Sequence, residues 1–249
     1  MRRFFVDEIL GTQGSVTITG AEARHIATVL RMGPGDRIVI LDKRGNRFLT
    51  VIKELSRRHV LLDLERPLPA PDPSPLYITL CQALLKSNPM DLLIEKTSEL
   101  GVDRILPYVA ERSVVKVGGG KSRIKVRRWQ EIAQSAAKQA DRARPAEILP
   151  PQSFDEMMEG LGNEQAMRIL LWEQEGVRSL KGLLRSGSAA PGILALVGPE
   201  GGFTEREVMG ATEAGFVPVS LGRRILRAET AAITLVAILQ YEWGDLSLP

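Results

Sequence analysis

Cysteine is nearly absent from this chain of 249 residues, because Cys81 is the only one. A single thiol excludes an internal disulfide and also excludes a zinc site built from several thiolates. Cys81 stands in the apolar run LYITLCQALL, where a thiol usually packs as a small hydrophobic side chain. We therefore interpret Cys81 as a core residue and give less weight to a reactive nucleophile.

Histidine is also scarce, since the chain has only His25 and His59, both in its first quarter. The remaining three quarters contain no imidazole for a metal site or for a Ser-His-Asp relay. The sequence therefore predicts chemistry that uses neither a metal ion nor a histidine base.

Long apolar runs are missing as well. No run approaches the roughly 18 to 20 residues that a helix needs to cross a bilayer. At the N-terminus, Asp7 and Glu8 interrupt the apolar stretch before the core of a secretory signal could form. We expect a soluble, globular protein of the cytoplasm that does not associate with a membrane.

Basic residues gather in one part of the chain. Between Arg112 and Arg144 there are ten basic residues but only two acidic ones, Glu131 and Asp141. On a folded surface such a patch attracts polyanions by releasing their counterions. A solvated helix face is the alternative interpretation. The basic residues are Arg112, Lys116, Lys121, Arg123, Lys125, Arg127, Arg128, Lys138, Arg142 and Arg144.

Prolines divide the chain into two parts. The segment PLPAPDPSPL has prolines at 67, 69, 71, 73 and 75, and their fixed φ and missing amide protons exclude a helix or a central strand. The segment therefore predicts a semi-rigid connector between a domain of residues 1–70 and a domain of residues 71–249.

The first domain is rich in short β-type runs. One helix is expected at residues 21–30, after a capping-box pattern of Thr19 and Glu22 and before Gly33-Pro34-Gly35. Residues 43–46 are a candidate hairpin turn. About 70 residues of this kind predict a small β-barrel. The expected strands are 2–10, 15–20, 36–42, 48–55 and 59–65.

In the second domain strands and helices alternate, which predicts an α/β fold with a mostly parallel sheet. Residues 167–173 and 192–198 are continuous apolar runs, typical of strands covered on both faces. A helix is expected to begin at Asn88 as its cap, with Pro89 in the first helical position. The other expected elements are strands 76–84, 103–110 and 216–221 and helices 123–140, from 204, and 230–243.

Two glycine-bearing loops follow buried strands: GPEGGF at 198–203 and LGRRILRAET at 221–230. In parallel α/β folds ligands bind beyond the carboxyl ends of the strands. The first loop lacks the Lys-Ser/Thr of a P-loop, and Glu200 breaks the G-x-G-x-x-G pattern. A carboxylate there repels phosphate and suits a neutral or cationic ligand. A tight connection without a ligand is the alternative.

The motifs LALVGPEGGFTEREV and VSLGRRILRAETAAITLVAILQY resemble the C-terminal signature of the SPOUT superfamily. Together with MDLLIEKTSELGV, ERSVVK, RWQEIAQSAAKQADR and RHIATVLRMGPGD, they resemble the ribosomal RNA small subunit methyltransferase E family. That family methylates uridine N3 of 16S ribosomal RNA. The resemblance implies a PUA-like barrel joined to a SPOUT domain with a deep trefoil knot. One family turn differs, because a Gln-Ser-Gly-Arg-like sequence is replaced by residues 139–142, QADR.

The resemblance also implies S-adenosylmethionine as cofactor, bound by the two loops. It implies a homodimer acting on 16S ribosomal RNA, within the small ribosomal subunit. The apolar last helix fits such an interface, although burial within one chain is the alternative. The implied cofactor contacts are Leu171, Gly198, Pro199, Glu200, Gly201, Gly202, Leu221, Gly222, Ile225, Leu226, Thr230 and Ala231.

Catalytic roles are expected for Arg227 and Glu229, between the second loop and the last helix. A guanidinium can stabilise the negative charge that builds on a uracil as N3 loses its proton. Glu229 would orient the arginine or accept the proton, and a structural ion pair is the alternative for both. Phosphate contacts are expected at Lys86, Arg112, Arg123, Arg127, Arg142 and Arg144. For Arg24, His25 and Arg31 RNA contact and surface salt bridges stay equally open.

Three other functions fit parts of this pattern. The protein could be a SPOUT RNA methyltransferase for another base or site. It could be a non-enzymatic RNA-binding module, for which the barrel and the basic patch suffice. It could also use GPEGGF as an anion loop for a nucleotide phosphate. Heat of binding with S-adenosylmethionine separates the enzyme from the pure RNA binder.

Overall fold

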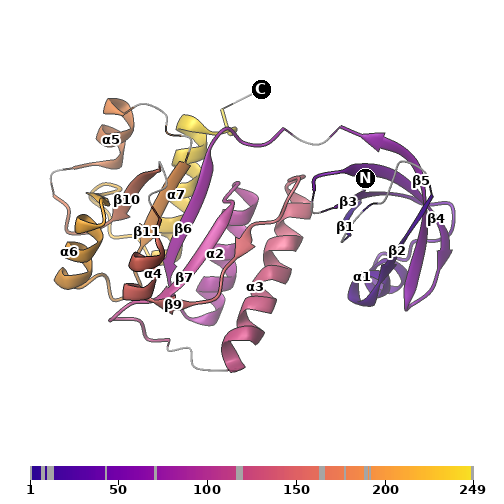
Figure 1. Cartoon of the computed structure of the whole chain (residues 1–249), viewed down its shortest axis with the longest axis horizontal. Coiled ribbons are helices and arrows are strands. Elements are labelled where there is room, and N and C mark those ends of the chain that lie inside the picture. Colours follow the sequence, from indigo (N-terminus) through magenta and orange to yellow (C-terminus); the bar gives the residue numbers. More distant parts are fainter. Residues whose placement is uncertain are drawn as a thin grey trace. The chain divides into compact units, whose positions relative to one another are not determined.

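The computed structural model describes residues 2–6, 9, 14–42, 44–69, 72–115, 120–162, 166–176, 178–187, 190 and 192–247. Contacts divide the chain into two compact units (Figure 1). The first is Met1–Pro73 with Asp141–Arg144, and the second is Ser74–Ala140 with Pro145–Pro249. The expected boundary between 70 and 71, and Lys43 of the expected hairpin turn, lie outside the described residues.

The first unit contains a five-stranded sheet in the order β1-β3-β4-β5-β2. β1 runs parallel to β3, and the other neighbours pair antiparallel. Apolar residues on one face, such as Ile38, Ile40 and Leu62, pack with Ile26 of the helix into a single core. The strands are β1 (Arg3–Phe5), β2 (Ser15–Thr19), β3 (Arg37–Leu41), β4 (Arg47–Leu55) and β5 (His59–Leu68).

The helix of this unit differs from the prediction. It begins as α1 (Gly20–Arg24) and continues as a π-helical turn, η1 (His25–Val29). The expected capping box was wrong, because the Thr19 side chain caps no amide of the first turn. Gly20, directly after Thr19, has φ +71, which turns the chain as it enters the helix.

The connector was also predicted too long, because β5 includes Pro67, paired with Phe48 of β4. Central strands exclude proline because each side of such a strand needs amide donors. Here β2 pairs with β5 only as far as Asp63. Beyond that point β5 has one described neighbour, so Pro67 occupies an edge position where its missing donor is tolerated.

Asp141, in the turn that departs from the family sequence, has φ +56. This left-handed conformation favours glycine, and an aspartate pays a modest strain to adopt it. Its carboxylate lies 2.7 Å from Arg3 Nε and 3.1 Å from an Arg47 guanidinium nitrogen, within the first unit. These ion pairs offset the strain and explain how an aspartate serves at this turn.

The second unit is built on a parallel sheet in the order β12-β10-β11-β6-β7-β8, with β9 also paired to β7. All its described strand pairs are parallel. The edge strand β12 carries Pro218, as an edge allows. The strands are β6 (Tyr77–Ala83), β7 (Arg104–Val109), β8 (Glu147–Ile148), β9 (Gln152–Ser153), β10 (Met167–Leu171), β11 (Gly192–Val197) and β12 (Val217–Val219).

Helices cover both faces of this sheet (Figure 1). Alternate residues of β11 divide between two cores: Ala195 and Val197 join one, whereas Leu196 joins the other. The first core packs against helices α2 (Ser87–Glu99), α3 (Gly120–Gln139), α5 (Leu180–Ser186) and α7 (Ala228–Trp243). The second packs against α4 (Phe154–Gly160) and α6 (Glu205–Glu213). The predicted two-sided burial of the parallel strands is confirmed.

Several helix boundaries shift from their predicted places. Asn88 is not the cap of α2, because the helix begins at Ser87 and Lys86 is its N-cap. Pro89 is therefore the third helical residue, which is allowed since first-turn amides need no helical partner. α7 begins two residues earlier than expected. α4 was not predicted, although Ser153 and Glu156 form its capping box.

Cys81 is fully buried, and burial raises the pKa of its thiol to about 12. The interpretation of Cys81 as a core residue is confirmed. Among the described residues, no three His, Cys, Asp or Glu side chains cluster as a metal site would require. The described helices include none with the length and apolar character of a membrane span.

Candidate active site

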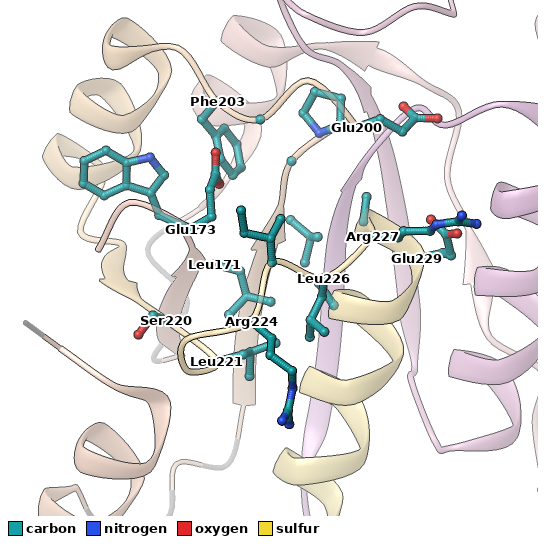
Figure 2. A pocket seen from close by; sticks show the side chains of 18 of the residues that line it. Leu171, Glu173, Glu200, Phe203, Ser220, Leu221, Arg224, Leu226, Arg227 and Glu229 are labelled. Carbon is teal, nitrogen blue, oxygen red and sulfur yellow. The ribbon is translucent and has the colours of Figure 1, made fainter. Parts of the chain in front are cut away.

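A cavity of about 680 Å³ lies at the carboxyl ends of β10, β11 and β12. Residues 171–173, 197–203, 219–229 and 231 line it, together with Pro89 of α2. Both loops that the sequence singled out thus border one space, as Figure 2 shows for their labelled side chains. The expectation that these loops fold together is confirmed.

The first loop needs its glycines for close packing. A Cβ on Gly198 would lie 2.9 Å from the Phe203 ring, and a Cβ on Gly202 would lie 2.5 Å from a Glu173 carboxylate oxygen. Gly202 also has φ +70, a conformation that other residues adopt only under strain. The loop therefore folds so tightly that side chains at these two positions do not fit.

The second loop leaves β12 through a sharp turn. Gly222 has φ +111, and open space surrounds the position of its missing Cβ. Upstream, Trp172 N donates to Val219 O at 3.0 Å, which ties the ends of β10 and β12 together. The next residue, Glu173, lies against the first loop, where its carboxylate meets the Cβ position of Gly202.

Polar side chains inside the sheet support the end of β11. Tyr108, fully buried on β7, donates its hydroxyl proton to Val197 O at 3.0 Å. Gln82, fully buried on β6, donates to Ala83 O at 2.9 Å and to Gly198 O at 3.4 Å. Neighbouring strands thus fix the point at which the first loop leaves the sheet.

Charges of both signs line the cavity. Three carboxylates, those of Glu173, Glu200 and Glu229, and three arginines contribute to its wall. Glu200 accepts a hydrogen bond from Lys86 N at 3.3 Å, at the start of α2. The arginines are Arg223, Arg224 and Arg227.

Arg227 and Glu229 both lie at the start of α7, where Arg227 is the N-cap residue. Glu229 is 8% exposed, whereas Arg227 is exposed, and both line the cavity. Their side chains extend from the start of the helix, while Arg224 leaves the loop in another direction (Figure 2). In the described part of the chain no ion pair joins Arg227 to Glu229, so the structural ion pair is not observed.

The lining accounts for nearly all cofactor contacts that the resemblance implied. The exception is Thr230, which is exposed and does not line the cavity. It is the third residue of α7. Lining residues that the sequence analysis missed are Pro89, Trp172, Glu173, Val197, Phe203, Val219, Ser220, Arg223, Arg224 and Ala228. Most of them are next to a predicted contact in the sequence, and this position alone could have indicated that they line the cavity.

The residues expected to bind RNA belong to both units. Arg24, His25, Arg31, Arg142 and Arg144 belong to the first. The second holds Lys86, Arg112, Arg123 and Arg127. All are exposed except Arg142, which is half-buried.

Several of these side chains already have partners, among them Arg144, which donates to Arg44 O at 3.4 Å. Arg127 pairs with Glu131 one turn along α3, at 3.3 Å. Arg112 donates to backbone carbonyl oxygens of the first loop. Arg112 therefore has a structural contact through Nη1 besides any contact that its other donors, Nη2 and Nε, make with a phosphate.

The cavity fits the cofactor that the resemblance implies. Its size is within the range of about 300 to 1,000 Å³ that small-ligand sites usually have. Leu171, Leu221 and Leu226 supply apolar wall for an adenosine. Carboxylates near the glycine loop suit a cationic sulfonium better than a phosphate.

Family comparisons cover most of the chain. A family described as RNA methyltransferase domain matches residues 72–240, and one described as RNA methyltransferase PUA domain matches residues 18–65. Ribosomal RNA small subunit methyltransferase E of Mycobacterium bovis is 31% identical, covering 96% of this chain and 92% of the relative. The enzyme of that name from Bacillus subtilis is 29% identical over 97% of both.

Solved structures agree with these relatives. Ribosomal RNA small subunit methyltransferase E of Neisseria gonorrhoeae, bound to S-adenosyl methionine, is 32% identical over 99% of both chains with a TM-score of 0.88. A methyltransferase of Legionella pneumophila in complex with the same cofactor is 29% identical over 98% of both chains, with a TM-score of 0.91. The predicted fold, a PUA-like unit before an α/β SPOUT unit, is confirmed.

Gly202 provides a direct test of the loop geometry. Gly202→Ala should destabilise the protein by about 1 to 3 kcal/mol, because alanine at positive φ is strained and its Cβ meets Glu173. Cofactor affinity, measured by calorimetry, should fall about tenfold or more if that strain opens the loop. Gly210→Ala is the matched control, since α6 gives its Cβ only an ordinary contact with Phe154. It should stabilise by about 0.4 to 1 kcal/mol. Equal behaviour of the two variants would contradict the tight packing at Gly202.

Proposed function

The chain belongs to the ribosomal RNA small subunit methyltransferase E family, and we propose that it transfers a methyl group from S-adenosylmethionine to N3 of a uridine in 16S ribosomal RNA. The substrate would be presented within the small ribosomal subunit. Such a substrate implies that the protein works in the cytoplasm. The SPOUT fold of this family implies the deep trefoil knot through which its cofactor loops pass.

One observation carries the proposal: the loops at 198–203 and 221–227 border a single cavity whose wall is apolar in part and carries carboxylates beside arginines. Bound there, S-adenosylmethionine would supply an electrophilic methyl group. The residues present to hold it are Leu171, Leu221 and Leu226 on the apolar side and the backbone of the glycine loop on the other. Their task is alignment, which can contribute about 7 to 11 kcal/mol to methyl transfer when the geometry is good.

Uridine N3 creates a second task for the chain, because this nitrogen carries a proton at neutral pH. As the proton leaves, negative charge builds on the flanking carbonyl oxygens. Arg227 has an exposed guanidinium at the cavity wall, and no ion pair to Glu229 neutralises it among the described residues. We assign it the stabilisation of that charge. Glu229 stands two residues after Arg227 and is largely buried. It orients the arginine or takes the proton.

The experiment that tests the activity incubates the protein with labelled S-adenosylmethionine and small ribosomal subunits from a strain that lacks the homologous enzyme. Label should appear in 16S ribosomal RNA, at N3 of one uridine when the digested nucleosides are analysed. Naked 16S RNA, assayed in parallel, identifies the form of the substrate. Cofactor binding without transfer to either substrate would contradict the proposal, and a label on another base would replace uridine N3 by that base.

Arg227→Ala should separate chemistry from cofactor binding. We expect kcat to fall by about 10² to 10³-fold, the usual loss when one donor to a developing oxyanion is removed. Cofactor affinity in calorimetry should be unchanged. Arg227→Lys keeps the charge but not the planar set of donors, so it should recover only part of the rate. Full activity of the alanine variant would remove this assignment.

RNA phosphates are the proposed partners of the basic side chains on α3. Arg123 and Arg127 are exposed, and the surface pair of Arg127 with Glu131 is weak enough to be exchanged. In an Arg123→Ala/Arg127→Ala variant the slope of log affinity against log salt should become shallower by about 1 to 2. Arg185→Ala, an exposed arginine on α5, is the control and should leave the slope as it is. An unchanged slope in the double variant would exclude these two phosphate contacts.

The proposed enzyme is a homodimer. Half-exposed or exposed residues of α7 recur at helical spacing along one stripe, at Ala231, Thr234, Ile238 and Tyr241. This stripe is largely apolar, and a second copy of the chain would cover it.

Tyr241→Glu should turn the dimer into a monomer in light scattering, because Tyr241 is 63% exposed and its loss opens no core. Met209→Glu on α6 is the matched control, since Met209 has the same exposed fraction. A wild-type protein that scatters as a monomer would refute the dimer.

A further inference from the structure

The segment that follows β7, residues 110–113, packs against the first cofactor loop. A Cβ added to Gly201 would lie 3.1 Å from Arg112 Cβ and 3.3 Å from Arg112 O. Gly201 is therefore a glycine because Arg112 lies behind it. The close approach places the Arg112 side chain against the loop backbone.

The Arg112 guanidinium bridges two carbonyl oxygens of that loop. Its Nη1 atom donates to Gly201 O and to Phe203 O, each at 3.2 Å. One charged donor thus joins two points of the loop that stand two residues apart. Gly202, whose φ of +70 favours glycine, lies between them.

A second connection joins the same two segments. Glu207, 2% exposed on α6, accepts a hydrogen bond from Glu111 N at 2.9 Å through one carboxylate oxygen. Its other oxygen accepts from Thr204 N at 2.9 Å, within the capping box of α6. Thr204 Oγ1 also lies 3.3 Å from a Glu111 carboxylate oxygen. A buried carboxylate therefore anchors residue 111 to the end of the loop.

We propose that Arg112 is a positioning residue: it holds the first loop in the conformation that receives S-adenosylmethionine. This inference rests on the proposed function, because it presupposes that cofactor. It assigns Arg112 a task different from the phosphate contact expected from the sequence. The bridge to Gly201 and Phe203 uses only Nη1, so it fixes the orientation of the guanidinium in the absence of any phosphate.

The physical reason is the entropy of a glycine-rich loop. The stretch 198–203 has three glycines, and glycine loses more conformational freedom on ordering than any other residue. A loop that is ordered before the ligand arrives reduces the entropy that binding must offset. Arg112 does not line the cavity, so it orders the loop without occupying the space that the cofactor needs.

The experiment compares Arg112→Ala, Arg112→Lys and wild type in cofactor calorimetry and in steady-state methyl transfer. The alanine variant should bind S-adenosylmethionine about tenfold more weakly, as expected for lost charge-assisted hydrogen bonds. KM for the cofactor should rise in step, while KM for RNA and its salt dependence stay as in wild type. The lysine variant should recover part of the affinity, and added guanidinium ion should partly restore the alanine variant.

Arg206→Ala is the matched control. Arg206 is an exposed arginine of the same unit, and it donates to both carboxylate oxygens of Asp155 without touching the loop. Its removal should leave cofactor affinity unchanged.

Two results would overturn the inference. One is wild-type cofactor affinity in the folded Arg112→Ala variant. The other is a loss confined to RNA affinity with a shallower salt slope, which would make Arg112 a phosphate contact. Failure of the proposed function looks different, since wild type itself would then give no heat with the cofactor. Thermal melting of each variant identifies one that has not folded. If Arg112→Ala does not fold, the cofactor affinity of Arg112→Lys tests the inference instead.

Discussion

The pairing of three parallel strands determines where the two loops and the cavity between them lie. β10 lies between β11 and β12, with Leu171 opposite Val197 on one side and Val219 on the other. Because parallel strands end at the same edge of a sheet, the chain leaves all three at one place. The cavity forms there because the two loops are distant in sequence but emerge on either side of the end of β10, each one strand spacing from it. No single motif creates the site, and a shift in this register would separate its two loops.

Support for the first loop comes from behind, through groups that the cofactor would not touch. Tyr108 and Gln82 hold the end of β11, and the buried Glu207 joins Thr204, directly after the loop, to Glu111. A glycine-rich stretch is too flexible to keep one shape by itself. The buried polar network supplies the missing constraint, and each of these bonds joins segments far apart in the sequence. The loop is thus specified by the sheet and its neighbours as much as by its own glycines.

Much of this could be predicted from the sequence, since strong local patterns survive folding. The apolar runs of β10 and β11 gave the parallel sheet, and the Thr204–Glu207 capping box appears as expected. Local patterns gave wrong predictions where the backbone conformation or a residue distant in the sequence determines the structure. The Thr19 hydroxyl does not cap its helix because Gly20 turns the chain. The partners of Arg112 lie about 90 residues away, so its sequence neighbourhood showed only a positive charge beside other positive charges.

Glu200 shows why the cavity does not suit a phosphate. The amino end of a helix is usually a ready anion site, because its first amides are unpaired and the helix dipole is positive there. α2 begins at this cavity, but the Glu200 carboxylate already accepts from Lys86 N at its start. The protein's own carboxylate thus lies beside the start of α2. A nucleotide phosphate there would be repelled by Glu200, whereas a sulfonium gains from the same carboxylate. One acidic residue in a glycine loop thereby turns a common anion-binding architecture towards a cationic cofactor.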